Sequence, residues 1–409
     1  MQQLTMFDPA PMTPTSTDFL SDLIDFDAFG QKTVATEEDG IPYFYNEFWT
    51  AGQRQAHSIH EVSYRACFKP QLPEFFISRL TASGDMVFDP FMGRGTTAVQ
   101  AALMGRRPAG NDVNPLSVML ARPRLRPITL GAIATALKTV DWSCGQIVRD
   151  DLLAFYHPDT LRQLEALRCW LADRAPLGAD LVDPVADWIR MVAINRLSGH
   201  SPGFFSGRSM PPNQAVSVKA QLKINEKLGV TPPPRDVAAI ILKKTRSLLK
   251  NGTVAKAMPA SLHVGPAWAV AGMASGSVDL VVTSPPFLDI VQYAADNWLR
   301  CWFAGIDPAA VAIDMHRTET AWSAMVARVL TEMARLVRPG GHVAFEVGEV
   351  RGGKVLLEKL VWQAAHGLPF TRLGVMVNVQ EFTKTANCWG VDNGAKGTNT
   401  NRIVLLRRD

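Results

Sequence analysis

An aliphatic run that stops at two consecutive prolines, residues 279–287 (DLVVTSPPF), limits the possible folds of this chain more than any other segment. Its β-branched side chains predict a buried parallel strand, and the prolines predict a loop at the carboxyl end of that strand. Proline has a fixed φ and no N–H, so the carbonyl of Pro285 is free to bind a ligand. We expect this carbonyl, the Ser284 hydroxyl and the Phe287 ring to hold an amine on a flat heterocycle, although an isolated Ser-Pro-Pro is also an ordinary turn sequence.

A second hydrophobic run that ends in a glycine turn lies upstream, at residues 87–98 (VFDPFMGRGTTA), and a helix-forming stretch follows at 99–104. Gly93 and Gly95 would let backbone N–H groups approach an anion at the start of that helix. The Gly-x-Gly-x-x-Ala spacing also fits an oxidoreductase with a nicotinamide cofactor, which is the first alternative. That alternative leaves the proline loop and the Asp-Pro-Phe sequence at residues 89–91 without a role.

These two segments together resemble the S-adenosylmethionine-dependent DNA amino-methyltransferases, which methylate an exocyclic amine of cytosine or adenine. That family has an acidic-Pro-Phe-x-Gly-x-Gly cofactor loop, similar to residues 89–95, and an (Asp/Asn/Ser)-Pro-Pro-aromatic catalytic loop, similar to residues 284–287. The resemblance implies S-adenosylmethionine as the cofactor and DNA as the partner. The implied catalytic residues are Ser284, Pro285, Pro286 and Phe287. The implied cofactor-binding residues are Asp89, Pro90, Phe91, Gly93, Gly95, Thr96, Thr97, Asp112, Thr283 and Lys69.

Two of these residues lie outside both loops. A strand predicted at residues 108–113 reaches Asp112 about twenty residues after the glycine turn, where a carboxylate can accept both ribose hydroxyls of an adenosine. Lys69 precedes Pro70 near the start of a predicted helix, as in a family segment that packs beside the cofactor. A helix that only covers the sheet is the alternative for Lys69.

The resemblance implies direct methyl transfer to a flipped-out base, without a metal or a covalent intermediate. Ser284 in place of Asp or Asn favours N4 of cytosine, and N6 of adenine is the alternative. A non-catalytic DNA-binding subunit that keeps the fold is another interpretation, and RNA is an alternative substrate. In this chain the cofactor loop precedes the catalytic loop. This order resembles that of family members whose target-recognition region lies between the two loops. The DPFxGxGTT sequence, however, is more usual in family members with the reverse order.

The predicted fold class is α/β, with a doubly wound, mostly parallel, seven-stranded Rossmann-like methyltransferase sheet and a largely helical insertion. Residues 1–40 hold eight acidic residues and one lysine, and predict a weakly ordered tail with a short helix. Residues 41–122 and 259–409 form the predicted catalytic domain, and residues 123–258 form the basic helical insertion. Within the insertion, helices are predicted around residues 161–171, 184–197 and 237–249. Later helices are predicted at 293–303, 318–337 and 354–365, and later strands at 342–347, 370–379 and 402–406.

Basic residues cluster in the middle of the chain, where residues 188–256 hold twelve basic and two acidic residues and favour a polyanionic partner. The glycine-punctuated segment 198–208 carries two phenylalanines suited to stacking on nucleic acid, with a place in the core as the alternative. The polar segment 381–401 is a candidate to close over the target base or the DNA backbone. The candidate DNA-binding residues are Arg196, His200, Phe204, Phe205, Arg208, Lys219, Lys223 and Lys384.

The cysteines and the hydropathy argue against several classes of protein. Five cysteines without a CxxC pair are typical of a reducing cytoplasm and of a protein with no structural zinc. None follows a proline, which argues against the Pro-Cys chemistry of related enzymes that methylate carbon 5 of cytosine. No apolar run approaches the ~18 residues of a membrane helix, and the acidic start is unlike a signal peptide. We expect a cytoplasmic protein of prokaryotic or phage origin, with no membrane or metal partner. A cognate restriction endonuclease is a candidate partner. The sequence leaves the oligomeric state open.

Overall fold

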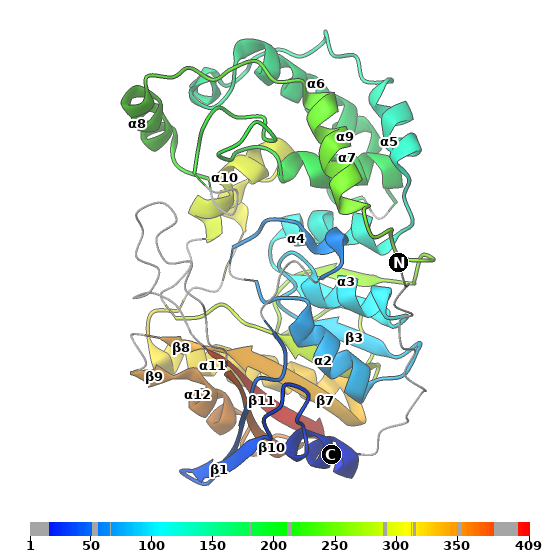
Figure 1. Cartoon of the computed structure of the whole chain (residues 1–409), viewed down its shortest axis with the longest axis vertical. Helices are drawn as coiled ribbons and strands as arrows, with labels where there is room; N and C mark the ends of the chain where they lie inside the picture. The colour runs from blue at the N-terminus through cyan, green and yellow to red at the C-terminus, as the bar shows by residue number, and fades with distance from the viewer. Residues whose placement is uncertain are drawn as a thin grey trace.

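The computed structural model describes residues 16–50, 56–65, 67–179, 181–210, 215–288, 293–311, 313, 316–350, 354–379 and 400–409. Within these residues the core is one mixed sheet of nine strands (Figure 1). In spatial order the strands are β1 (Val34–Glu38), β2 (Ile41–Asn46), β10 (Phe370–Val379), β11 (Thr400–Arg408), β7 (Val337–Val347), β6 (Val278–Thr283), β3 (Met86–Asp89), β4 (Arg107–Asp112) and β5 (Ser261–Val264). The last five are parallel, β11 runs antiparallel between β7 and β10, and β2 lies parallel to β10.

Both faces of this sheet are covered, because side chains alternate between two hydrophobic clusters along the inner strands. On β11, Ile403 and Leu405 join one cluster while Val404 and Leu406 join the other. The first cluster packs against α1 (Ser16–Ile24), α2 (Gln71–Leu80) and α3 (Thr96–Leu103), and the second against α11 (Glu319–Leu336) and α12 (Leu357–Ala364). The predicted doubly wound α/β sheet is therefore confirmed.

The sheet has nine strands, two more than the predicted seven. Residues 34–46 form an antiparallel hairpin of β1 and β2, and β2 extends the sheet beyond β10. In the segment IPYFYN, Ile41, Tyr43 and Phe44 are buried. They are buried because this strand pairs with β10, more than 300 residues later in the chain, and no local signal in the sequence indicates that pairing.

Residues 16–40 are ordered rather than a weakly ordered tail, and the short helix predicted within them is α1. Phe19 and Leu23 are four residues apart and are buried on one face of α1, and Phe26 is buried just after the helix ends. The ring of Phe19 packs 6.4 Å from that of Phe76 on α2, measured between centroids. Apolar anchors at helical spacing therefore outweigh the acidic composition, and residues 1–15 lie outside the described residues.

Residues 123–258 supply a layer of helices beside the sheet (Figure 1). These helices are α5 (Leu130–Leu137), α6 (Pro158–Arg174), α7 (Pro184–Ile194), α8 (Val218–Leu228) and α9 (Val237–Leu248). α4 (Pro115–Ala121) and α10 (Tyr293–Ala304) join the same hydrophobic cluster from the sheet-forming parts of the chain. The predicted helices around 161–171, 184–197 and 237–249 are confirmed as α6, α7 and α9, whereas α5 and α8 have no counterpart among the predicted helices.

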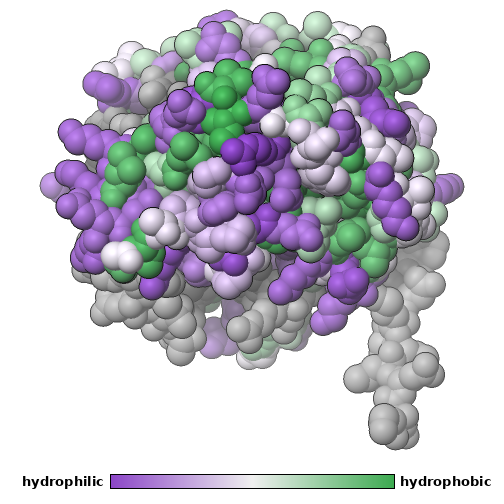
Figure 2. Space-filling model, turned by 90° about the horizontal axis from the view of Figure 1, so that it is seen from above, coloured by the Kyte–Doolittle hydropathy of each residue, from purple (hydrophilic) through white to green (hydrophobic). Residues whose placement is uncertain are grey.

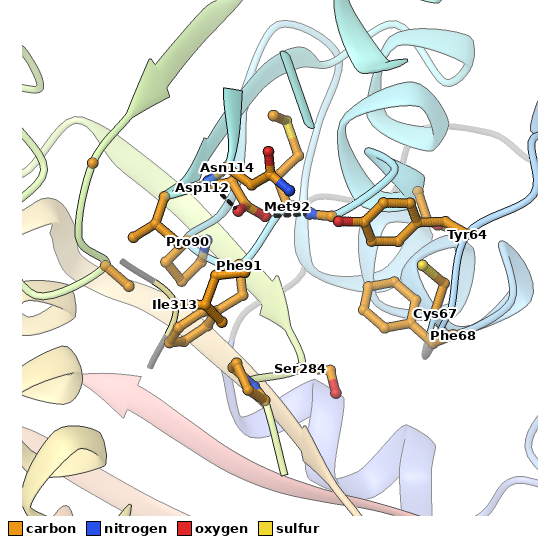
Figure 3. A pocket seen from close by; sticks show the side chains of 16 residues that line it. Tyr64, Cys67, Phe68, Pro90, Phe91, Met92, Asp112, Asn114, Ser284 and Ile313 are labelled. Carbon is orange, nitrogen blue, oxygen red and sulfur yellow. Dashed lines mark hydrogen bonds between the residues drawn. The ribbon is translucent and has the colours of Figure 1, made fainter. Parts of the chain in front are cut away.

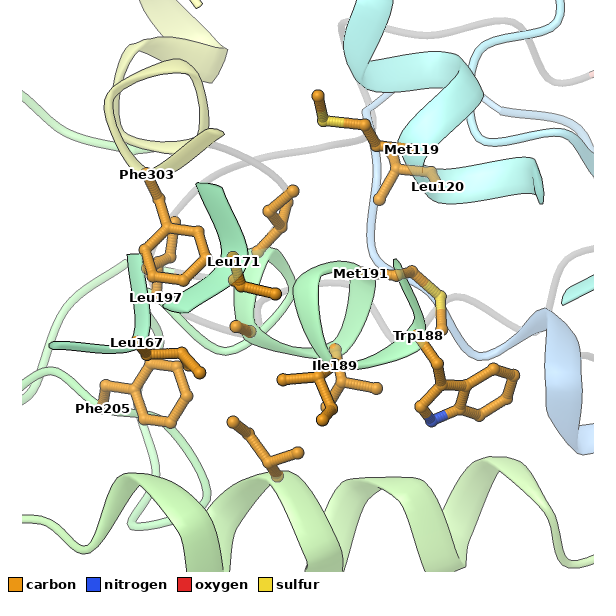
Figure 4. Packing of buried hydrophobic residues seen from close by; sticks show 14 of the residues in the cluster. Met119, Leu120, Leu167, Leu171, Trp188, Ile189, Met191, Leu197, Phe205 and Phe303 are labelled. Carbon is orange, nitrogen blue, oxygen red and sulfur yellow. The ribbon is translucent and has the colours of Figure 1, made fainter. Parts of the chain in front are cut away.

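Helix α7 is the centre of this layer. Figure 4 shows Trp188, Ile189 and Met191 of α7 between Met119 of α4 and helix α9. The Trp188 indole N–H also donates a 3.1 Å hydrogen bond to Thr245 Oγ1 of α9, which satisfies its polar atom inside the core. The helical layer is thus packed as a core of its own against α4, which follows strand β4.

Two smaller features complete the fold. The predicted helix at 354–365 begins later, at Leu357, because β9 (Val355–Leu356) pairs with β8 (Glu349–Val350) in a small antiparallel hairpin. The surface over the helical end is largely hydrophilic, with separate hydrophobic patches (Figure 2). Among the described helices, none has both the length and the hydropathy needed to cross a lipid bilayer.

Candidate active site

The glycine turn and the proline loop meet because β3 and β6 are neighbouring parallel strands. At their carboxyl ends, Thr283 Oγ1 donates a 2.7 Å hydrogen bond to Asp89 Oδ1, and the Phe91 N–H donates to the same oxygen at 3.0 Å. Burial raises the pKa of Asp89 to about 7, and the hydrogen bonds from Thr283 and Phe91 oppose that shift. Asp89 is therefore a buried residue whose carboxylate connects the two loops by hydrogen bonds.

Two glycines allow the turn after β3. Gly93 and Gly95 have φ values of 51° and 78°, in the region that favours glycine. A Cβ on Gly95 would lie 2.6 Å from the Cβ of Ala121, so α4 packs directly against the start of α3. Between the glycines, the buried Arg94 guanidinium donates to the carbonyls of Val62 at 2.9 Å and Phe68 at 3.2 Å, which fixes the preceding loop against the turn.

Asp112 ends strand β4, where its two carboxylate oxygens each accept one backbone N–H. The donors are Gly93, at 2.8 Å from Oδ2, and Asn114, at 2.9 Å from Oδ1 (Figure 3). Burial raises the pKa of Asp112, and these two hydrogen bonds oppose the shift. Each oxygen keeps a second lone pair, so the carboxylate can still accept hydroxyl groups from a ligand.

A cavity lies among these elements, with Asp112 on one wall and Ser284 on another (Figure 3). Tyr64, Cys67 and Phe68 form a wall opposite Phe91. The full lining is Tyr64, Cys67, Phe68, Pro90, Phe91, Met92, Gly93, Thr96, Asp112, Val113, Asn114, Gly265, Ala267, Ser284, Pro286 and Ile313. The cavity is thus mostly apolar with a few polar groups, which is typical of a small-molecule site.

The structure divides the residues predicted for cofactor and catalysis into two groups. Those that line the cavity are Pro90, Phe91, Gly93, Thr96, Asp112, Ser284 and Pro286. The others, Asp89, Gly95, Thr97, Thr283, Lys69, Pro285 and Phe287, do not line it. Thr97 is buried, with Oγ1 donating to the Val282 carbonyl at 3.0 Å, and Phe287 is half-buried against the cluster on the α11 face. Lys69 is half-buried, and burial lowers its pKa.

The proline loop lies against two side chains that the sequence did not indicate, Glu346 and Trp322. The pairing of Thr283 with Phe345 places the Ser284 hydroxyl within hydrogen-bonding reach of Glu346, a buried residue on β7. The Asn401 side chain on β11 donates to Glu346 Oε1 at 2.8 Å. The indole N–H of Trp322 on α11 donates to the Pro286 carbonyl at 2.8 Å.

Most of the lining residues missed by the sequence come from segments without a motif. Tyr64, Cys67 and Phe68 reach the cavity because Arg94 holds their loop, and Gly265 follows β5, whose pairing with β4 is a tertiary feature. Asn114 is the exception, because it precedes a proline and its side chain caps α4 by accepting from the Leu116 N–H at 3.0 Å. The Asn-Pro pair after β4 was therefore a readable signal.

The candidate DNA-binding residues are in different environments. Phe204 and Phe205 are buried, which contradicts stacking on nucleic acid and agrees with the alternative of a place in the core. Phe205 packs in the helical core, and the Arg196 guanidinium carbon lies 4.0 Å from the Phe204 ring centroid. Burial lowers the pKa of Arg196 to about 10. His200, Arg208, Lys219 and Lys223 are exposed, and Lys384 lies outside the described residues.

Within the described residues, no group of three or more His, Cys, Asp or Glu side chains is arranged to hold a metal ion.

Comparison with known proteins identifies a methylase segment. A family model described as DNA methylase, for N6 and N4 methyltransferases, matches residues 30–122. The type II methyltransferase M.MjaII of Methanocaldococcus jannaschii is 41% identical over 73 residues, which is 18% of this chain and 13% of that protein. The type II methyltransferase M.MvaI of Kocuria varians is 25% identical over 122 residues, 29% of this chain and 27% of that protein. The matches thus span between an eighth and about a quarter of the length of these relatives.

Among solved structures, a putative DNA modification methylase of Thermus thermophilus, complexed with S-adenosyl-L-methionine, aligns with 36% of this chain and 54% of its own, at 25% identity and a TM-score of 0.22. The family model covers the glycine turn and Asp112, and the curated relatives are DNA methyltransferases. Residues 30–122 are therefore similar to the DNA amino-methyltransferases that act on N6 or N4.

Proposed function

We propose that this protein is an S-adenosylmethionine-dependent DNA methyltransferase that modifies the exocyclic N4 of cytosine in a flipped-out base. The observation that carries the proposal is that Ser284 and Pro286 share one cavity with Gly93 and Asp112. A cofactor site and a site for an amine therefore adjoin at the carboxyl ends of neighbouring strands, where sheets of this kind bind ligands.

The residues on the cofactor side fit S-adenosylmethionine. Asp112 has acceptor capacity for two ribose hydroxyls, because each oxygen holds a single backbone N–H. Gly93 and Gly95 keep the turn at the start of α3 free of side chains, and Phe91 and Met92 offer apolar surface to an adenine ring. The cofactor supplies an electrophilic methyl group on a sulfonium.

The proline loop orients the amine of the base. The lone pair of an exocyclic amine is delocalised into its ring, so the amine is a weak nucleophile. The Ser284 oxygen and the Pro285 carbonyl accept its two hydrogens and direct the lone pair towards the methyl donor, because the Pro286 carbonyl already accepts from Trp322. Phe287 lies next in the loop to stack on the ring. Most of the acceleration comes from this positioning.

The DNA duplex is held by the basic helical layer. Lys219 and Lys223 are exposed, four residues apart on α8, and so share one face of that helix. Arg208 is exposed just before α8, and its carbonyl accepts a 2.8 Å hydrogen bond from Gln221 of that helix. Contacts from these residues to phosphates offset the few kcal/mol needed to flip a base out of the stack.

The test is incubation of the protein with DNA and labelled cofactor, followed by digestion to nucleosides and mass spectrometry. We expect N4-methylcytosine from the wild type and none from Ser284→Ala. N6-methyladenine in place of N4-methylcytosine overturns the choice of base, and label transferred to RNA but not DNA overturns the choice of substrate. If no label is transferred to nucleic acid while DNA still binds, the protein is a non-catalytic DNA-binding subunit.

A further inference from the structure

Glu346 is a buried carboxylate that the reaction above does not use. It is 5% exposed on β7, and the register that pairs Phe345 with Thr283 brings Glu346 beside Ser284 at the adjacent strand end. Among the described residues, the polar groups beside its carboxylate are the Asn401 amide, 2.8 Å from Oε1, and the Ser284 hydroxyl. We propose that Glu346 is a positioning residue that orients Ser284 and receives, through the Ser284 hydroxyl, the proton that the base amine loses on methylation; this inference rests on the proposed function.

The contacts of Glu346 differ from those of a structural ion pair. Glu358, which is fully buried, binds the Arg402 guanidinium at 2.9 Å, as a buried carboxylate requires. The Glu346 partners, Ser284 and Asn401, are both neutral. A buried carboxylate with neutral partners is costly to ionise, and such groups are concentrated at functional sites.

Among the titratable groups on the elements around Glu346, Asp89 and Arg402 have partners of their own. On β3, Asp89 binds Thr283; on β11, Arg402 binds Glu358; and on β7 itself, His342 lies four residues away on the same face. Helix α2 carries Glu74, whose pKa is raised by burial. Burial raises the pKa of Glu346 to about 7, and the hydrogen bonds from Ser284 and Asn401 oppose that shift. Glu346 therefore changes charge near neutral pH.

The proton balance of the reaction explains why Ser284 needs this neighbour. When the amine nitrogen forms its bond to the methyl carbon, the carbon–sulfur bond breaks and its electron pair stays on sulfur. The nitrogen then carries a positive charge and must lose a proton. Ser284 Oγ accepts that proton as its own proton passes to Glu346, so the products are a neutral methylated amine, an unchanged serine and a neutral carboxylic acid. The acid returns its proton to solvent after the base leaves.

The ionised form of Glu346 is the one that accepts the proton, so the rate rises with pH through the pKa of that group. In single-turnover methyl transfer between pH 5.5 and 9, we expect the wild-type rate to increase up to about pH 7 and then to level off. Glu346→Gln keeps the shape and a hydrogen bond to Ser284, so its rate should fall by about 10² to 10³-fold and lose this pH dependence. Glu346→Asp should keep the pH dependence at a reduced rate.

A second measurement needs no turnover. Infrared titration of the protein without cofactor should show a carboxylic acid band that disappears near pH 7 and is missing in Glu346→Gln. In Ser284→Ala the same band should persist to higher pH, because the lost hydrogen bond stabilised the ionised form. Cofactor affinity should stay within about twofold of wild type in Glu346→Gln, since Glu346 does not line the cavity.

Glu358→Gln is the matched control, a change to a buried carboxylate that does not contact Ser284. It should lower thermal stability and leave the pH dependence of the rate intact. A Glu346→Gln variant that methylates with the wild-type pH profile, or a wild-type protein without the titrating infrared band, overturns the inference while the proposed function stands. A wild-type protein that transfers no methyl group overturns both. If Glu346→Gln fails to fold, the Glu346→Asp profile and the Ser284→Ala titration decide the question in its place.

Discussion

The indole N–H of Trp322 donates a 2.8 Å hydrogen bond to the carbonyl of Pro286, so helix α11 is tied to the proline loop at the end of β6. Trp322 is almost fully buried in the cluster on that face of the sheet. A carbonyl between a proline and an aromatic residue has no partner in a helix or strand at this position, and the indole supplies one.

Trp322→Phe should therefore leave the Pro286 carbonyl without its donor while most of the packing remains. We expect a loss of about 1–3 kcal/mol in the free energy of unfolding and a fall in kcat of roughly tenfold or more, since the loop positions the amine. The affinity for cofactor should change little. Urea unfolding and single-turnover kinetics measure the two effects. Trp362→Phe on α12, whose ring stacks on Arg372 at 4.7 Å, is the control: it should lose stability and keep kcat.

Asp112→Asn replaces one carboxylate oxygen by an NH₂ group, which cannot accept from Gly93 or Asn114. It also removes an acceptor for a ribose hydroxyl. We expect the Kd for S-adenosylmethionine to rise by about 10- to 100-fold, equivalent to about 1.4–2.8 kcal/mol. Isothermal titration calorimetry measures this. Asp141→Asn, a change to an exposed carboxylate, should bind as the wild type does; equal affinities for both variants would contradict a cofactor site at Asp112.

Gly95→Ala should be more harmful than Gly178→Ala, although both glycines have a φ of 78°. The left-handed conformation costs alanine about 1–2 kcal/mol at either position. At Gly178 a Cβ meets nothing within 4 Å, whereas at Gly95 it lies 2.6 Å from Ala121 Cβ. The difference between the two variants in urea unfolding isolates the contact between α3 and α4, which we expect to be about 1–3 kcal/mol. Equal losses would show that α4 moves aside freely.

Asp89 makes folding stability depend on pH. Its pKa is about 7 in the folded protein and 3.8 as the reference value, so the folded state binds the extra proton between these pH values. The contribution of Asp89 to the free energy of unfolding is therefore greatest below pH 4 and falls as the pH rises to about 7. Asp89→Asn keeps an Oδ1 that can accept from both Thr283 and Phe91. We expect it to exceed the wild type in stability at pH 8, by an amount on the order of a few kcal/mol, and to lose that advantage at pH 4. If the free energies of unfolding of the wild type and of Asp89→Asn, measured with urea, differ by the same amount from pH 4 to pH 8, the raised pKa of Asp89 is contradicted.

Lys219→Ala and Lys223→Ala should weaken DNA binding without changing cofactor affinity. If each lysine contacts one phosphate, the slope of log K against log salt should become shallower by about 0.9 per substitution. Fluorescence anisotropy with duplex DNA at several salt concentrations measures the slope. Lys138→Ala, an exposed lysine at the end of α5, on the other side of the helical layer from α8 in Figure 1, is the control and should keep the wild-type slope.

The sequence predicted the parts of the site that have local signals. A glycine turn, a strand that ends at Asp112 and a proline loop are each readable within a dozen residues, and the cavity brings Gly93, Asp112 and Ser284 together. Glu346 was not readable, because HVAFEV is simply a strand until the register with β6 puts its carboxylate beside Ser284. Phe204 and Phe205 show the opposite case, in which a flexible-looking loop folds inward around a core that only tertiary packing defines.

The pairing of β2 with β10 joins residues that are synthesised far apart in time. Asn378 Oδ1 accepts hydrogen bonds from the backbone N–H groups of Phe48, at 2.7 Å, and Trp49, at 3.3 Å, and the first of these contacts spans 330 positions. On the ribosome, the β1–β2 hairpin therefore waits with an unpaired edge until β10 emerges, and the helical layer has by then been translated in full. Completion of this sheet is a late event of biosynthesis, and an exposed edge strand during that interval is a place where a chaperone can act.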